Sequence, residues 1–246
     1  MDFGEYYDLM PSNFGQYELA RFGQTLPHLL TDGTLLDVGC GNGNWLTYVA
    51  ERARDLKLSG VDISPKRIST ARKRLSKDVG LEVADIRALP FSNEQFNQVT
   101  ALEVLEHLPD WKKGLSELTR VSSHRVIATV PYGKQLKYEV CWKCGSKAYL
   151  EGHLHSLTED NFSTFQCNGQ LSYELLPQPV GIGYYFNRFL RGSKLHDDGE
   201  HDLVAVCPNC YAENPYSTRT RMKKIFERIV CVVTNKPEHL LIQIDK

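Results

Sequence analysis

The chain has 246 residues, of which 41% are hydrophobic and 24% are charged, and its 29 lysine and arginine residues almost balance 30 aspartate and glutamate residues. This composition is that of a globular protein and excludes collagen-like, coiled-coil and mainly disordered chains. A net charge of −1 gives no electrostatic argument for nucleic acid as the partner.

No apolar run approaches the length of about 18 residues that a membrane span needs. Residues 1–5 also lack the basic-then-apolar layout of a signal peptide. We therefore expect no membrane span and a cytoplasmic location. In that compartment the seven cysteines would be reduced thiols or metal ligands.

Strands and helices alternate along the first half of the chain. Hydrophobic periodicity predicts strands at 34–39, 59–63, 81–85, 98–104 and 125–130, and helices at 44–54, 65–77 and 110–121. A helix at 158–165, a strand at 171–176, a helix at 219–232 and a strand at 239–244 follow. This alternation is typical of parallel βαβ units with right-handed crossovers, and so of an α/β fold.

The same pattern divides the chain into a core and two inserts. We expect an N-terminal helical cap at 1–34, a cofactor-binding core at 35–131, irregular inserts at 132–155 and 177–217, and segments 156–176 and 218–246 that complete the core. The inserts interrupt the alternation of strand and helix and are rich in glycine, proline and aromatic residues.

Glycines crowd the turn between the first predicted strand and the first predicted helix, in Asp37-Val38-Gly39-Cys40-Gly41-Asn42-Gly43. Such glycines let a ligand approach the backbone closely, and the helix that follows offers free N–H groups. Asp62 ends the second strand, where a carboxylate can accept both hydroxyl protons of a ribose. Asp85 ends the third strand and can reach an adenine amino group. The alternative is that the glycines form only a tight turn and that Asp62 caps a helix. This alternative does not explain why the glycine loop, Asp62 and Asp85 occur together in this order.

These residues resemble the class I S-adenosylmethionine-dependent methyltransferases, and so does Leu102-Glu103-Val104-Leu105-Glu106-His107-Leu108-Pro109-Asp110. The resemblance covers about residues 15–131 and resumes at 156–176 and 239–245. It implies a doubly wound, Rossmann-like sheet of about seven strands with an antiparallel last strand, and S-adenosyl-L-methionine as the cofactor.

The resemblance also implies roles for single residues. Asp37, Gly39, Cys40, Gly41 and Gly43 would line the amino-acid end of the cofactor. Asp62 and Ile63 would hold the ribose, and Asp85 and Ile86 would flank the adenine. Leu102 and Glu103 would lie under the methionine portion.

Glu103, Glu106 and His107 are spaced i, i+3 and i+4, so they share one face if this turn is helical. Transfer of a methyl group to a hydroxyl needs a base or a metal ion to lower the proton affinity of the oxygen. Two carboxylates and an imidazole suit Mg²⁺ or Mn²⁺, or a carboxylate that orients a histidine base. Carboxylates that only brace backbone amides are the alternative.

The E-x-x-E-H pattern is similar to that of small-RNA 2′-O-methyltransferases and ubiquinone-pathway O-methyltransferases, in which it holds a catalytic divalent ion. By this resemblance His153 would complete the RNA-methylating version, with His155 as the alternative. Four other histidines have no partner in the pattern and are expected on the surface: His124, His196, His201 and His239.

Two C-x-x-C turns, Cys141 to Cys144 and Cys207 to Cys210, lie in the two inserts. Two such turns can close a tetrahedral Zn²⁺ site, and four thiolate ligands leave no open position for chemistry. We therefore expect a structural zinc ion that clasps the inserts together. A redox C-x-x-C is the alternative, although such a motif normally opens a thioredoxin-like helix.

These features predict an enzyme that transfers a methyl group from S-adenosylmethionine to a small-molecule, glycan or natural-product acceptor, at oxygen. Metal-dependent RNA 2′-O-methylation is one alternative, and a non-catalytic cofactor-binding partner subunit is another. The sequence pattern carries no signal for an oligomeric state.

Overall fold

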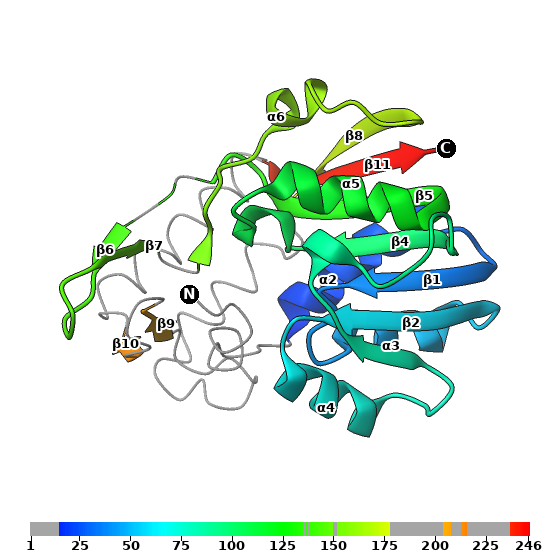
Figure 1. The fold of residues 1–246 in the computed structure, drawn as a ribbon, viewed down its shortest axis with the longest axis horizontal. Coiled ribbons are helices and arrows are strands. Elements are labelled where there is room, and N and C mark those ends of the chain that lie inside the picture. The colour runs from blue at the N-terminus through cyan, green and yellow to red at the C-terminus, as the bar shows by residue number, and fades with distance from the viewer. Residues whose placement is uncertain are drawn as a thin grey trace.

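A computed structural model describes residues 15–134, 136, 138–149, 152–177, 204–207, 213–215 and 237–246. Its main feature is a seven-stranded sheet with the order β3-β2-β1-β4-β5-β11-β8 (Figure 1). The strands are β1 (Gly33–Val38), β2 (Leu56–Asp62), β3 (Gly80–Val83), β4 (Phe96–Leu102), β5 (Ser122–Pro131), β8 (Gln170–Pro177) and β11 (Pro237–Asp245). The first five pair in parallel, whereas β11 runs antiparallel to both β5 and β8. The predicted Rossmann-like α/β sheet with an antiparallel last strand is confirmed.

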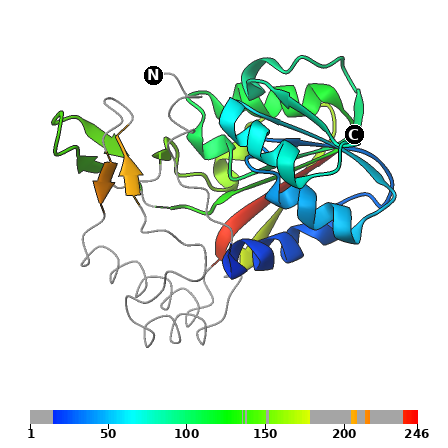
Figure 2. The ribbon, with the colours of Figure 1, turned by 90° about the horizontal axis from the view of Figure 1, so that it is seen from below.

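Helices cover both faces of this sheet. They are α2 (Gln16–Thr25), α3 (Asn44–Arg52), α4 (Pro65–Arg74), α5 (Trp111–Val121) and the short α6 (Glu159–Ser163). Figure 2 shows α2 and α3 below the sheet and α5 above it. Each face has its own apolar core: Trp45 and Leu46 of α3 belong to one, and Leu115 and Leu118 of α5 to the other. The predicted helix at 219–232 lies outside the described residues.

The helices begin where the sequence supplies a cap. The Ser64 hydroxyl accepts the backbone N–H of Arg67 at 3.0 Å, and Pro65 occupies the first helical position of α4. The Asp110 carboxylate accepts the N–H of Lys113 at 3.1 Å and so starts α5. These caps fix the points at which the chain leaves the carboxyl edge of the sheet.

The strand order reverses between β1 and β4, because the chain adds β2 and β3 on one side of β1 and then β4 and β5 on the other. In open α/β sheets, ligands bind in the crevice at such a switch point, beyond the carboxyl ends of the strands. The loop after β1 and the turn after β4, which contains the 3₁₀ helix η3 (Leu105–His107), therefore meet there. Figure 1 shows α2 at this same edge.

The first insert is more regular than predicted. Instead of an irregular run, it contains a hairpin of β6 (Tyr138–Val140) and β7 (Lys147–Tyr149), joined through a turn in which Gly145 has a φ of +70°. Glycine adopts this left-handed conformation without the clash that a Cβ causes. In the second insert, β9 (Val204–Val206) pairs with β10 (Glu213–Pro215). The domain boundaries drawn around the inserts stay predictions.

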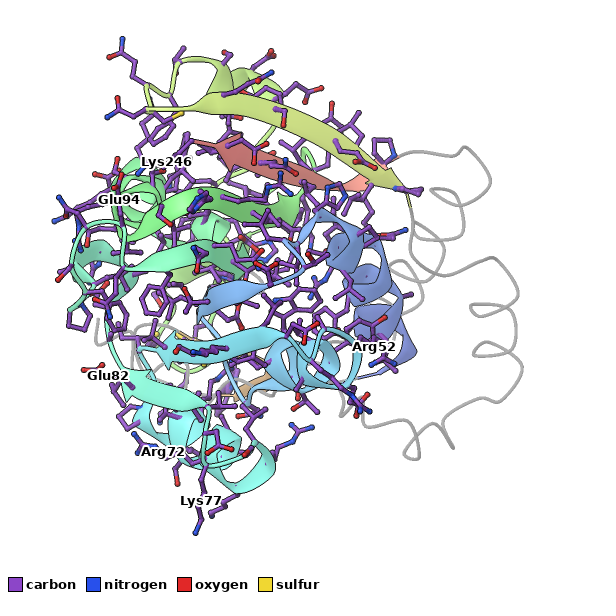
Figure 3. All side chains as sticks on the ribbon, turned by 90° about the vertical axis from the view of Figure 1, so that its right-hand side faces the viewer. Arg52, Arg72, Lys77, Glu82, Glu94 and Lys246 are labelled. Atoms are coloured by element: carbon purple, nitrogen blue, oxygen red, sulfur yellow. The ribbon has the colours of Figure 1, made fainter. Side chains whose placement is uncertain are left out.

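The edge of the sheet opposite the switch point is closed by charged side chains rather than by a site. Figure 3 looks onto this edge and shows Lys246 beside Glu94. The two side chains form an ion pair at 2.8 Å, and Lys246 also donates to the Ser122 carbonyl. An exposed pair of this kind contributes little stability. Among the described residues, no helix is long and apolar enough to cross a membrane.

Candidate functional site

The glycine loop after β1 takes a path that only glycine follows easily. Gly39, Gly41 and Gly43 have φ values of +77°, +54° and +78°. A Cβ on Gly39 would lie 2.5 Å from a methyl carbon of Val104, so the loop packs directly against the turn after β4. The Gly39 and Cys40 N–H groups both donate to the Val61 carbonyl of β2, which fastens the loop to that strand.

Cys40 lies inside this loop and is only 6% exposed. Burial, together with the nearby carboxylates of Asp37 and Asp62, raises the pKa of its thiol far above the usual range. A thiol that stays protonated is neither a nucleophile nor a metal ligand. Cys40 therefore contributes shape to the loop and no chemistry of its own.

Asp62 points into the glycine loop. Its Oδ2 accepts the Gly41 N–H at 2.8 Å, and its Oδ1 accepts the Ser64 N–H at 2.9 Å. The residue is 7% exposed, and the neighbouring Ile63 is half-buried. Each carboxylate oxygen can accept more than one hydrogen bond. The ribose contact of Asp62 stays a prediction.

Asp37 lies deeper than the loop and is 3% exposed. The Thr100 hydroxyl donates to its carboxylate at 2.8 Å, and the Trp45 indole N–H donates to that hydroxyl at 3.2 Å. Burial raises the pKa of Asp37 to about 7, the Thr100 hydrogen bond opposes this rise, and the charge of Asp62 adds to it. The sequence pattern gave no signal for Thr100, which lies on β4.

Asp85, after β3, is held by a neighbour that the sequence reasoning did not consider. Its carboxylate forms an ion pair with the Arg87 guanidinium at 2.6 Å and also accepts the Arg87 backbone N–H at 2.8 Å. These contacts hold the pKa of Asp85 below its usual range. Ile86 beside it is buried. The adenine contact stays a prediction, and an adenine amino group would share this carboxylate with Arg87.

Glu103 does not share a helical face with Glu106 and His107, so that expectation is wrong. The helical turn after β4 begins only at Leu105, and Glu103 has a left-handed φ of +59°. This backbone conformation breaks the i, i+3, i+4 relation on which the expectation rested. Leu102, the last residue of β4, is half-buried.

The carboxylate of Glu103 contacts three side chains on α2, β5 and β11. Its oxygens lie 3.4 Å from an Arg21 guanidinium nitrogen, 3.6 Å from His239 Nε2 and 3.2 Å from the Thr129 hydroxyl. His239 is 3% exposed, so its predicted place on the surface is wrong. It is the third residue of β11, and neither spacing nor motif signals its contact with Glu103.

Glu106, His107 and His153 converge on the other side of the turn. Glu106 Oε1 lies 3.6 Å from His107 Nε2 and 3.9 Å from His153 Nε2, and the two imidazole rings meet edge to face at 4.7 Å. Backbone contacts lock this arrangement, because the Leu154 and His155 N–H groups donate to the Glu106 carbonyl. The His155 ring instead contacts the Leu108 carbonyl at 2.8 Å, which leaves His153 as the histidine of the cluster.

Glu106 is the most deeply buried member of this cluster. His107 Nδ1 lies 3.2 Å from the Gly152 carbonyl, which can only accept, so a hydrogen bond here requires the proton on Nδ1. Glu106 is 1% exposed, and its carboxylate oxygens have no hydrogen-bond partner among the described residues. Burial, and then the charge of Glu103, raise the pKa of Glu106 well above its usual value. A raised pKa favours the protonated form of the Glu106 carboxyl.

Three of the four cysteines predicted to bind metal come together. The sulfur atoms of Cys141, Cys144 and Cys207 lie within 4.8 Å of one another, and Cys144 Sγ is 3.7 Å from Cys207 Sγ. The Ser146 hydroxyl lies 3.0 Å from Cys144 Sγ and 3.4 Å from Cys207 Sγ. Cys210 lies outside the described residues. The first C-x-x-C turn therefore lies beside Cys207, the first cysteine of the second turn, as expected.

Comparison with known proteins gives a family match for one segment of the chain. Residues 35–124 match the family model described as "Methyltransferase domain". The chain contains a class I, Rossmann-like methyltransferase domain. The matched segment of this methyltransferase domain runs from β1 to the start of β5 and so includes the glycine loop, Asp62, Asp85 and the turn after β4.

Curated relatives of the methyltransferase domain act on small molecules, according to their names. Ajmaline N-methyltransferase of Rauvolfia serpentina is 32% identical over 94 residues, which are 36% of this chain and 32% of the relative. The 27-O-demethylrifamycin SV methyltransferase of Amycolatopsis mediterranei is 38% identical over 106 residues, which are 41% of this chain and 38% of the relative. The matches thus span only about a third of the length of these relatives.

Solved structures share the fold of the methyltransferase domain. The [4+2]-cyclase SpnF has a TM-score of 0.61 at 16% identity and covers 99% of this chain and 95% of its own. Coclaurine N-methyltransferase has a TM-score of 0.60 at 13% identity and covers 93% of this chain and 70% of its own. At such low identity these likenesses show the fold alone.

The raised pKa of Asp37 predicts a pH-dependent stability. In the unfolded chain Asp37 ionises near pH 3.8, whereas in the folded domain it stays protonated until about pH 7. The folded state therefore binds the extra proton between these values, and stability falls as the pH rises through that window. We expect Asp37→Asn to increase the free energy of unfolding relative to wild type by about 2–4 kcal/mol at pH 8 and by much less at pH 4. Urea unfolding at both pH values measures this difference, and an equal difference at both would contradict it.

Proposed function

We propose that this protein transfers the methyl group of S-adenosylmethionine to an oxygen of a small-molecule acceptor, such as a glycan or a natural product. The methyltransferase domain and the names of the small-molecule relatives support the reaction and the class of acceptor. The single observation that carries the proposal is the Asp62 carboxylate, which lies against the side-chain-free turn of the glycine loop. A ribose that docks there places its nucleoside at the carboxyl edge of β1 and β2.

Binding of S-adenosylhomocysteine tests this proposal. Asp62→Asn keeps the shape of the side chain but replaces one acceptor oxygen with an amide donor, so it should weaken binding by about 1.5–3 kcal/mol, or roughly 10- to 150-fold. Asp78→Asn, at an exposed aspartate beyond α4, is the matched control and should bind like wild type. Isothermal titration calorimetry gives both constants. A wild-type protein that binds neither S-adenosylhomocysteine nor S-adenosylmethionine would falsify the proposal.

The proton that the acceptor hydroxyl loses would go to the cluster of Glu106, His107 and His153 after β4. A hydroxyl that attacks the sulfonium methyl must lose its proton, and the imidazole of His107 is the group that would accept it. The resulting imidazolium nitrogen would lie 3.6 Å from the buried Glu106 side chain. We therefore assign His107 as the base, with Glu106 beside it and the Gly152 carbonyl in contact with Nδ1 of the imidazole.

A divalent cation held by Glu106, His107 and His153 is the second way in which this cluster could assist the reaction. One carboxylate oxygen and two imidazole nitrogens form a donor set suited to Mn²⁺ and other first-row ions more than to Mg²⁺, which prefers oxygen. Donor atoms about 2.1 Å from one ion lie roughly 3.0–3.4 Å apart. The observed 3.6 and 3.9 Å therefore need to close by only a few tenths of an ångström. When bound, such an ion would act as a Lewis acid that lowers the pKa of an acceptor hydroxyl.

Manganese binding separates the two candidates. If Glu106, His107 and His153 hold a cation, wild type should bind Mn²⁺ at one site, detected by electron paramagnetic resonance of the free ion. His153→Ala should lose this site, because one of three ligands is gone. His124→Ala, at an exposed histidine, should keep it. Wild type that leaves all Mn²⁺ free, or a His153→Ala variant that binds as wild type does, would contradict the metal assignment and leave the base mechanism.

The thiolate cluster is the proposed structural zinc site, with Cys141, Cys144, Cys207 and Cys210 as ligands. Two sulfur atoms bound at about 2.3 Å to a tetrahedral zinc ion lie about 3.8 Å apart, which matches the 3.7 Å between Cys144 and Cys207. The Ser146 hydroxyl can donate a hydrogen bond to either thiolate. Bound zinc would neutralise thiolate charge and link the two inserts. Such reduced thiolates agree with the proposed cytoplasmic location.

Elemental analysis tests the zinc assignment. The purified protein should contain about one zinc ion per chain, because structural zinc sites with thiolate ligands bind tightly. Cys207→Ser should lose most of this zinc. Cys167→Ser, at a half-buried cysteine that lies outside the cluster, should retain it. Full zinc content in the Cys207→Ser protein would show that the metal lies elsewhere.

A further inference from the structure

The two most exposed large hydrophobic side chains among the described residues lie at the tip of the β6–β7 hairpin. Trp142 is 69% exposed and Val140 is 60% exposed, whereas the others of this kind range from 37% to 44%. Figures 1 and 2 both show this hairpin at one end of the molecule, apart from the seven-stranded sheet. A protruding apolar tip with polar surroundings is typical of a surface that contacts a protein or a membrane.

The backbone of the hairpin holds both side chains outward. Val140 pairs with Lys147, and the Cys141 N–H donates to the Ser146 carbonyl at 2.9 Å, so the pairing continues one residue beyond β6. Successive side chains of a strand point to opposite faces. Cys141 is 3% exposed and belongs to the thiolate cluster, so Val140 and Trp142 on either side of it face water. Their exposure thus follows from the strand pairing.

Two lysines surround the apolar tip. Lys143 follows Trp142 in the turn, Lys147 lies opposite Val140 in the ladder, and both lysines are exposed. Residues 138–149 contain these two lysines and one glutamate, so this segment has a formal net charge of +1 in a chain with a net charge of −1. Tryptophan flanked by lysine is a combination that binds at a membrane surface, where the ring lies at the level of the headgroups and the ammonium groups meet anionic lipids.

A membrane surface fits this tip better than a protein or a nucleic acid does. A stable protein interface involves about 20–30 residues on each side, whereas the tip offers only a few exposed side chains within residues 140–147. Single-stranded nucleic acid binds in basic grooves that track many phosphates, and two lysines on a protruding tip do not form such a groove. Val140 has no aromatic face on which a base could stack, but an aliphatic side chain is favourable among lipid chains.

We propose that the tip of the β6–β7 hairpin, formed by Val140, Trp142, Lys143 and Lys147, docks the protein onto an anionic membrane surface. Val140 and Trp142 enter the headgroup region, and the two lysines stay beside the lipid phosphates. The docking is peripheral and reversible, because two apolar side chains are far fewer than a membrane span requires. It needs neither cofactor nor acceptor, so it is independent of the proposed function.

Binding to lipid vesicles tests this docking through Trp142 itself. The other two tryptophans, Trp45 and Trp111, are 3% and 7% exposed, so a change in emission on addition of vesicles reports Trp142. Vesicles of equal parts phosphatidylcholine and phosphatidylglycerol should shift the emission of wild type to shorter wavelength and should sediment the protein. Vesicles of phosphatidylcholine alone should bind at least about fivefold more weakly, because they lack the anionic charge.

Two variants separate the apolar from the electrostatic contribution. Trp142→Ala should lose the emission shift and bind the mixed vesicles at least about tenfold more weakly, because the indole supplies most of the buried apolar surface. Lys143→Gln combined with Lys147→Gln keeps the tryptophan but should bind roughly 25-fold more weakly, because each lysine near an anionic surface contributes about fivefold. Unchanged thermal unfolding of each variant shows that it is folded.

Leu175→Ala is the matched control. Leu175 on the edge strand β8 is 42% exposed, so the variant removes a comparable exposed hydrophobic side chain from another part of the surface. It should bind both kinds of vesicle as wild type does. A loss equal to that of Trp142→Ala would show that exposed hydrophobic residues bind lipid without regard to the hairpin, which would contradict the assignment.

Three further outcomes overturn the assignment. Wild type that sediments with neither kind of vesicle, or a Trp142→Ala variant that sediments as wild type does, would show that the tip does not contact lipid. Wild type that instead binds oligouridylate would assign the tip to nucleic acid, and wild type that forms a dimer would assign it to a second copy, if Trp142→Ala abolishes that property. None of these measurements involves S-adenosylhomocysteine, so the proposed function is tested separately.

Discussion

The hydrogen bond between the Gly41 N–H and the Asp62 carboxylate joins the two parts of the chain on which the rest of the site depends. Because β1 and β2 are parallel neighbours, the glycine loop and Asp62 leave the sheet at the same edge. The loop can approach Asp62 only because its glycines adopt positive φ values. A glycine-rich backbone and a fixed carboxylate thus lie side by side, as the proposed docking of a ribose requires.

This arrangement has an electrostatic cost. Asp37 and Asp62 lie close enough to repel each other, and the pKa of Asp37 rises to about 7 with burial as the main cause. Glu103 and Glu106 repeat the pattern at the end of β4, where the charge of Glu103 adds to the effect of burial on Glu106. Strain and repulsion of this kind concentrate at functional sites, where a bound ligand can offset them.

The turn after β4 separates two carboxylates that the sequence spacing appeared to unite. The left-handed backbone at Glu103 directs its side chain to α2, β5 and β11, whereas Glu106 contacts His107 and His153. Under our proposed function, the second group takes up the proton that the acceptor hydroxyl loses.

The sequence allowed prediction of those features that depend on local pattern. Hydrophobic periodicity located the strands of the sheet, and the glycine spacing with Asp62 located the switch-point site. The meeting of Cys141 and Cys144 with Cys207 was also predicted, because each C-x-x-C turn is recognisable locally and two such turns suit one zinc ion.

Other contacts between residues far apart in the sequence could not be predicted in this way. Thr100 on Asp37, and Arg21 and His239 on Glu103, are set by strand order and helix packing, which no spacing rule encodes. The Arg87 contact with Asp85 is local, but its sequence pattern is too common to be informative. The helical spacing at Glu103 failed because a single left-handed residue interrupts it.

The most direct test of this account is a crystal structure of the protein with S-adenosylhomocysteine. We predict that both ribose hydroxyls lie within hydrogen-bonding distance of the Asp62 carboxylate, about 2.5–3.0 Å between oxygens, with the glycine loop against the ligand. A nucleoside bound elsewhere, or a ribose that does not contact Asp62, would contradict the account, whatever metal the cysteine cluster contains.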